Sequence, residues 1–138
     1  MDDDLTVSKF EEYVSFVDAV SSESTQSTKS LIDTIGIMEE QGAKVSRLLT
    51  AGIGLSGEVG ELNDIIKKVV FQGAEYDDYT KLHLKKELGD ICWYMAQACM
   101  ALDTSFEEIL DINIEKLSDR YPEGFDALRS ASRKEGDI

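Results

Sequence analysis

The chain has 138 residues, of which 42% are hydrophobic, and its formal net charge is −14. This length suits one domain with a hydrophobic core, and the acidic balance argues against binding nucleic acid or an anionic membrane through basic side chains. The acidic N-terminal residues and the lack of a long apolar run predict neither a signal peptide nor a membrane-spanning helix. We therefore expect a cytoplasmic protein in which Cys92 and Cys99, spaced i,i+7 on one helix, are reduced thiols.

A single proline and long runs of apolar residues at helical spacing predict an all-α protein, a bundle of four or five helices. No internal repeat marks a second domain, so residues 1–138 are expected to form one domain. Within it, residues 1–42 are predicted as N-terminal helices and residues 127–138 as a flexible polar tail.

The N-terminal part of the chain predicts two helices separated by a polar segment. Capping residues over 6–12 lead into apolar residues at helical spacing up to Val20, which predicts a first amphipathic helix. Residues 21–30 are rich in serine and threonine and are predicted as a loop. Apolar residues over 31–38 predict a second helix that ends near Gly42.

Two long helices are predicted next, over residues 43–71 and 78–102. Gly73 is expected to end the first in the left-handed conformation, and Asp77 or Asp78 to cap the second. A connection this short favours antiparallel packing. The apolar residues of both helices recur at helical spacing and are expected to form core stripes, with Trp93 also in the core: Val45, Leu48, Leu55, Val59, Leu62, Ile66 and Val69 on the first, and Leu84, Leu88, Ile91, Met95, Ala98 and Leu102 on the second.

A last helix is predicted from Thr104 to Arg120. Thr104 and Glu107 have the spacing of a capping box at its start. The Tyr121-Pro122 step ends it, because proline cannot continue a helix.

Each long helix carries an acidic pair, Glu58/Glu61 on the first and Glu87/Asp90 on the second. The i,i+3 spacing places both members of a pair on one helix face. At a rise of ~1.5 Å per residue, Glu61 lies ~15 Å before the connecting turn and Glu87 ~14 Å after it. Either pair alone is typical of a solvated face, but two pairs at matching depth beside the apolar stripes predict that the four carboxylates converge.

Four converging carboxylates predict a metal site, because they cannot all stay ionised side by side without a cation. An all-oxygen ligand set suits Mg²⁺, with Mn²⁺ as a possible substitute, better than zinc. A di-iron carboxylate site is excluded because neither pair has the histidine of an E-x-x-H motif. His83 is solitary in the sequence.

The order of these motifs, E-x-x-E on one helix and E-x-x-D on the next, resembles the MazG-like all-α nucleoside triphosphate pyrophosphohydrolases. The resemblance covers roughly residues 45–125. It implies their fold, hydrolysis of an NTP or dNTP to the monophosphate and pyrophosphate with Mg²⁺, and a homodimer or homotetramer with sites near the subunit interfaces. The segments that look like the family's blocks are Gly54–Leu62, Lys67-Lys68, Glu87–Asp90, Trp93-Tyr94 and Asn113–Pro122.

The resemblance also suggests how substrate is held. Asn113, Lys116 and Arg120 lie at i, i+3 and i+7 on one helix face, where they are either surface polar residues or donors to phosphate oxygens, as in the family. Lys68 is a further candidate, although an i,i+4 ion pair with Asp64 explains it equally well. Tyr94 shares the helix face of Glu87 and Asp90 and is expected to line the site.

In the expected reaction, water attacks the α-phosphorus and Glu58 or Glu61 accepts its proton. The competing hypothesis is a non-enzymatic acidic helical protein that binds a basic partner or mimics nucleic acid. The base and sugar of the substrate are left open by the sequence, with a purine such as dGTP or GTP as the first guess.

Overall fold

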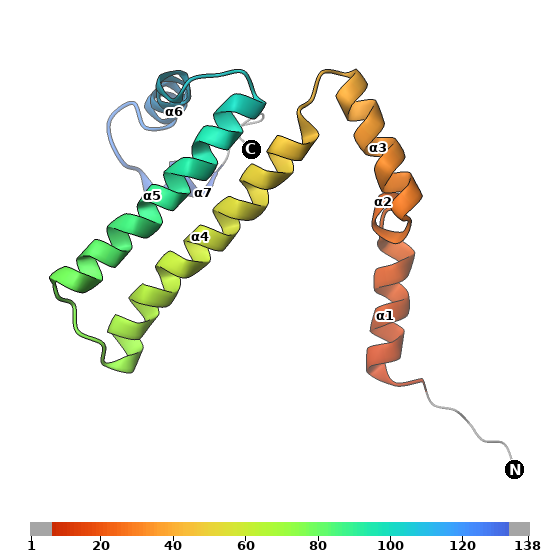
Figure 1. Cartoon of the computed structure of the whole chain (residues 1–138), viewed down its shortest axis with the longest axis horizontal. Helices are drawn as coiled ribbons and strands as arrows, with labels where there is room; N and C mark the ends of the chain where they lie inside the picture. The colour runs from red at the N-terminus through yellow and green to blue at the C-terminus, as the bar shows by residue number, and fades with distance from the viewer. Residues whose placement is uncertain (1–6, 133–138) are drawn as a thin grey trace, which may run out of the picture. The chain divides into compact units, whose positions relative to one another are not determined.

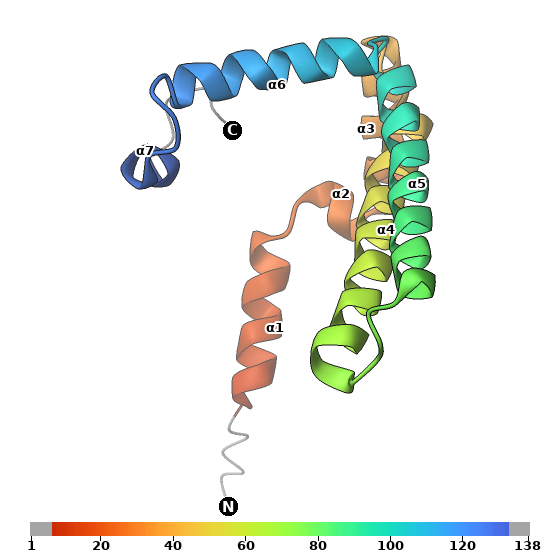
Figure 2. The same ribbon diagram turned by 90° about the vertical axis from the view of Figure 1, so that its left-hand side faces the viewer.

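The structure is a computed structural model in which residues 7–132 are described. Its contacts divide the chain into two compact units, Met1–Val45 and Ser46–Ile138. Among the described residues five helices have 12 to 28 residues and no strand forms (Figures 1 and 2). The all-α class predicted from the sequence is therefore confirmed.

The N-terminal unit contains three helices, α1 (Lys9–Val20), α2 (Glu23–Gln26) and α3 (Thr28–Glu40). Ser8 and Glu11 cap the start of α1 reciprocally: the Ser8 hydroxyl accepts from the Glu11 amide at 3.2 Å, and the Glu11 carboxylate accepts from the Ser8 amide at 2.7 Å. Thr6, predicted as a capping residue, lies outside the described residues.

The loop predicted over residues 21–30 is wrong, because α2 and the first turn of α3 lie there. The Ser27 hydroxyl accepts from the Ser30 amide at 3.3 Å and so caps α3. Ser24 hydrogen-bonds to Thr34 at 3.0 Å, which links α2 to α3. The serines and threonines taken as loop formers act here as helix caps and as links between short helices, which the same residue types allow.

The second unit is built on two antiparallel helices, α4 (Val45–Gln72) and α5 (Asp78–Ala101), joined by a short turn (Figure 1). Gly73 has the expected positive φ of 73°, which favours glycine. Asp77 caps α5 by accepting from the Thr80 amide at 2.9 Å. The antiparallel pair predicted from the turn residues is thus confirmed.

After the pair, α6 (Phe106–Arg120) leads away from the end of α5 at a steep angle (Figure 2). Its cap is Ser105, whose hydroxyl accepts from the Glu108 amide at 3.1 Å, so the capping residue lies one position after the predicted Thr104. The Thr104 hydroxyl instead donates to the Glu108 carboxylate.

The C-terminal residues of the unit include α7 (Ala127–Ala131), which lies within the segment predicted as a tail. The remainder of that predicted tail, residues 133–138, falls outside the described residues. None of the helices among residues 7–132 is long and apolar enough to cross a membrane.

The apolar stripes of α4 and α5 are less buried than expected. Val45, Ala51 and Ala101 are the buried apolar residues among those described, whereas Leu88 is 50% and Leu102 60% exposed. Trp93, expected in the core, is 54% exposed. The reason is geometric: a helix that packs against a single neighbour buries one narrow face, and the rest of a wide apolar stripe stays uncovered.

Candidate metal centre and active site

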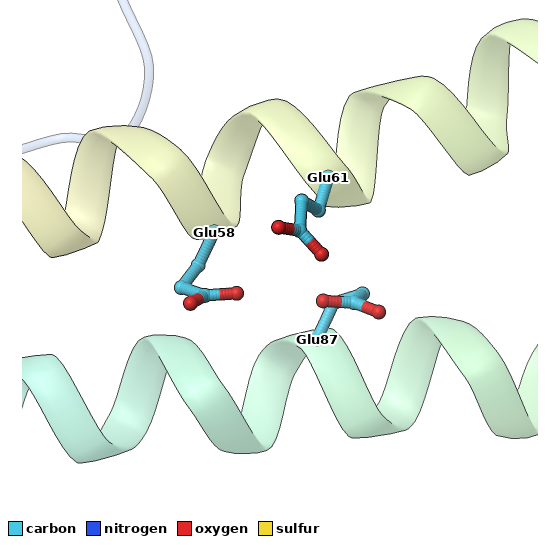
Figure 3. A group of neighbouring side chains, drawn as sticks. All are labelled: Glu58, Glu61 and Glu87. Carbon is cyan, nitrogen blue, oxygen red and sulfur yellow. The ribbon is translucent and has the colours of Figure 1, made fainter.

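Three carboxylates meet between α4 and α5. Glu58, Glu61 and Glu87 each place one carboxylate oxygen within 4.8 Å of those of the other two. Figure 3 shows Glu58 and Glu61 reaching from one helix and Glu87 from the other into the space between them. The i,i+3 spacing on α4 and the matching distance of Glu87 from the turn produce this meeting, as the sequence predicted.

Asp90 lies one turn after Glu87 on α5 and is exposed. It does not belong to the group of oxygens within 4.8 Å of one another. Its negative charge nevertheless reaches the group, because it contributes to the raised pKa of Glu58. A role for Asp90 as fourth metal ligand stays a prediction.

The cluster is electrostatically unfavourable without a cation. Removal of water raises the pKa of the Glu58 carboxyl above its ordinary value, and the negative charges of Glu61, Asp90 and Glu87 raise it further. A bound divalent cation would reverse this repulsion. Three carboxylates that face one another from two helices also match the oxygen ligands that Mg²⁺ and Mn²⁺ prefer, so the residues fit such an ion.

An open hollow of about 430 Å³ adjoins the cluster on the side of the α4–α5 turn. This volume falls in the range of roughly 300–1,000 Å³ that is usual for small-molecule sites. Glu61 and Glu87 contribute to its wall, so two of the three clustered carboxylates face into it. The residues that line it are Gly57, Gly60, Glu61, Asp64, Ile65, Lys68, His83 and Glu87.

His83 is the residue in this wall that the sequence analysis missed. It is the one histidine of the sequence, so no second histidine indicates a site there. Its i,i+4 spacing from Glu87 was the available signal, since residues four apart share a helix face. Tyr79, a further turn back on α5, contacts its ring in a tilted arrangement, with centroids 4.2 Å apart.

Lys68 forms the ion pair considered in the sequence and also borders the hollow, and its binding of substrate stays a prediction. Its ammonium lies 2.6 Å from Asp64, the i,i+4 ion pair, and its side chain also lines the hollow. Lys67 pairs with the same carboxylate at 2.5 Å. The hydrogen bonds from Lys67 and Lys68 lower the pKa of Asp64 to about 2, so this turn of α4 carries two cations and one firmly ionised acid.

Tyr94 packs between the helices rather than in the hollow. A Cβ atom added at Gly54 would lie 2.0 Å from its Cε1 atom, so the ring rests directly on the glycine backbone of α4. Trp93 meets Tyr94 edge-on, with ring centroids 4.8 Å apart. This packing explains the need for glycine at position 54, and a contact of Tyr94 with substrate stays a prediction.

The three predicted phosphate donors lie on α6. Asn113 and Lys116 are exposed and Arg120 is half-buried. None of the three lines the hollow beside the carboxylates. Within one chain the structure therefore does not bring them to the cluster, and their role in binding substrate also stays a prediction.

Comparison with known proteins identifies the family. "Gene 37 protein" of Mycobacterium phage L5 is 35% identical in an alignment 78 residues long. The alignment covers 52% of this chain and 64% of that protein, slightly less than two thirds of its length. No solved structure matches the chain. The sequence profile of the MazG nucleotide pyrophosphohydrolase domain matches residues 48–125, which contain α5, α6, most of α4 and all four predicted metal ligands. Because this match covers more than half of the chain, the chain belongs to the family of MazG nucleotide pyrophosphohydrolase domains.

Proposed function

We propose that the protein is a Mg²⁺-dependent pyrophosphohydrolase that converts a nucleoside triphosphate or deoxynucleoside triphosphate to its monophosphate and pyrophosphate. The observation that carries this proposal is the meeting of Glu58, Glu61 and Glu87 between α4 and α5, beside a hollow of nucleotide-binding size. Membership of the MazG family supplies the reaction class.

Glu58, Glu61, Glu87 and Asp90 are the residues that would hold Mg²⁺. When bound, the ion offsets the negative charge of the phosphate oxygens and so permits a polyanion to enter an acidic site. Either Glu58 or Glu61 accepts the proton of the attacking water.

Positive and polar side chains hold the triphosphate in this proposal. Lys68 is already at the wall of the hollow. Asn113, Lys116 and Arg120 complete the set as donors to phosphate oxygens. Since α6 leads away from the α4–α5 pair within one chain (Figure 2), the donors on α6 reach a site only when a second copy brings them there.

A homodimer or homotetramer is therefore part of the proposal. The wide apolar stripes on the second unit support it, because contiguous exposed apolar surface of this kind marks protein interfaces. One such area is a small hollow of about 120 Å³ between α4, α5 and α6, lined among others by Leu55, Met95, Leu102 and Phe106. Reduced thiols at Cys92 and Cys99, both free, suit the proposed cytoplasmic location.

The experiment that tests the function is a nucleotide panel with Mg²⁺, in which early products are separated by chromatography. We expect a nucleoside monophosphate and pyrophosphate, with dGTP or GTP as the first substrate to examine. A nucleoside diphosphate and free phosphate at early times would overturn the proposed bond choice. The matching control removes divalent ions with a chelator. All turnover should then be lost, and addition of Mg²⁺ should restore it.

A further inference from the structure

We propose that His83 is a substrate-binding residue and that the pyrophosphate half of the nucleotide lies in the hollow between the carboxylate cluster and the α4–α5 turn. This inference rests on the proposed function and gives the bound nucleotide a direction: its phosphate chain runs from the cluster towards Lys68 and His83.

The first observation that supports the inference is the position of His83. The half-buried ring lines the same hollow as Glu61 and Glu87. His83 precedes Glu87 by one helical turn, roughly 6 Å along α5, and Lys68 follows Glu61 by about two turns, roughly 10 Å along α4. The hollow thus extends from the metal-binding residues to one imidazole and one ammonium group on opposite helices.

The second observation that supports the inference is the hydrogen-bonding chemistry of the His83 ring. The ring nitrogens of His83 are not part of the oxygen cluster formed by Glu58, Glu61 and Glu87, so the geometry does not make His83 a ligand of the same ion. An imidazole N–H is a hydrogen-bond donor in either protonation state. The Tyr79 ring lies against the imidazole with the two planes inclined by 46°.

The third observation that supports the inference is the distribution of charge around the hollow. At the cluster the charged residues that line the hollow are the carboxylates Glu61 and Glu87, whereas towards the turn the ammonium group of Lys68 also lines it, paired with Asp64. An anion held by a cation at the cluster therefore finds an ammonium group within the hollow in the direction of the turn.

The last observation that supports the inference concerns the side of the cluster that faces away from the turn. Beyond Glu58, away from the turn, the Tyr94 ring rests on the backbone of Gly54. Further along, Arg47 donates to the Gln97 amide oxygen at 2.7 Å. The hollow on this side, next to Leu55 and Met95, is lined mainly by apolar side chains, which do not suit a phosphate chain. A phosphate chain that starts at the cluster therefore extends towards His83.

The test measures binding of Mg²⁺-pyrophosphate and of dGMP with Mg²⁺ by calorimetry, using the full chain. His83→Ala removes the ring and favours the helix, while His83→Gln keeps an N–H donor. Lys85→Ala, an exposed residue of α5 outside the wall of the hollow, is the control for a general change of charge. Circular dichroism establishes that each variant keeps its helix content.

We expect His83→Ala to bind pyrophosphate about tenfold more weakly, the loss typical of one hydrogen bond to a charged group, and to bind dGMP within about twofold of the wild type. His83→Gln should recover part of the loss and Lys85→Ala should show none. Equal weakening for both ligands, no weakening, or a Gln variant no better than Ala would each overturn the inference. Failure of the proposed function is a separate result, namely wild-type protein that hydrolyses no nucleotide, and pyrophosphate binding is measured independently of it.

Discussion

The two ends of the α4–α5 pair differ in what occupies the space between the helices. Near the turn lies an open hollow bordered by charged side chains, among them Glu61, Lys68 and Glu87. At the far end the Tyr94 ring sits on Gly54, and Arg47 hydrogen-bonds to Gln97. The same two helices thus make a closed, packed end that sets their separation and an open, charged end that is left for ligands.

This division explains why acidic residues are tolerated between two helices. Mutual repulsion of the carboxylates, expressed in the raised pKa of Glu58, would push α4 and α5 apart at the open end. Packing at the closed end opposes that separation. Four changes test the division, beginning with the one expected to have the largest effect.

Glu61→Gln should abolish the chemistry of the open end. Glutamine has a similar helix propensity but is a poorer ligand for a hard cation, so activity should fall about a hundredfold or more, since even outer-shell partners of a metal cost roughly 10–100-fold. Without Mg²⁺ the melting temperature should rise or stay the same, because one repulsive charge is gone. Glu39→Gln on α3 is the isosteric control, and unimpaired hydrolysis by Glu61→Gln would refute the site.

Lys116→Ala tests whether the residues of α4 and α5 alone bind the phosphates at the open end. If α6 of a second copy supplies a phosphate contact, catalytic efficiency should fall about ten- to a hundredfold. Stabilisation of the protein by Mg²⁺ in thermal melts should be unchanged, unlike in Glu61→Gln. Lys29→Ala on α3 is the control, and a kinetically silent Lys116→Ala would leave Lys68 and His83 as the phosphate contacts.

Gly54→Ala should disturb the packing of α4 against α5 at the closed end and lower the stability of the protein. The added methyl group would meet Tyr94 Cε1 at 2.0 Å, and overpacking of this kind costs about 1–3 kcal/mol. Gly52→Ala, on the same helix with nothing within 4 Å of its added Cβ, should instead gain about 0.5–1 kcal/mol from helix propensity. Urea unfolding of both variants gives the measurement. Equal stability of the two would mean that Tyr94 does not hold the helices together.

Asp64→Asn should have the smallest effect, a modest loss of stability that is seen in neutral and weakly acidic solution. The pKa of Asp64 is lowered from 3.8 to about 2, so its ion pairs stabilise the folded state fully above about pH 4 and lose that contribution as the pH falls towards 2. The pairs are exposed and the effect is modest. Melting temperatures of wild type and variant should differ above pH 4 and converge near pH 2; a constant difference would contradict the assignment.

The helices and their ends were largely predictable because the signals are local. Gly73 and Asp77 end α4 and begin α5 where the turn chemistry predicts. The errors are also local: serines over 21–30 were interpreted as a loop although Ser27 caps a helix, and the cap of α6 is Ser105. Serine favours both loops and caps, so composition alone does not separate them.

Burial was predicted poorly because it depends on neighbours far away in the sequence. An apolar stripe on α4 or α5 indicates that a face will be covered, not what covers it. Leu88, Leu102 and Trp93 stay at least half exposed in one chain. A second copy of the chain is the proposed cover, and no periodicity within one sequence encodes its position.

By itself, the sequence determined the all-α class, the antiparallel pair and the meeting of Glu58, Glu61 and Glu87, because helical periodicity and one short turn settle which residues share a face and at what depth. Only the tertiary structure decided that the space beside these carboxylates is open towards the turn and closed towards Gly54. It also placed His83 in the wall of that space. The reason is that the volume between two helices depends on which side chains fill it, and this is a property of both helices together.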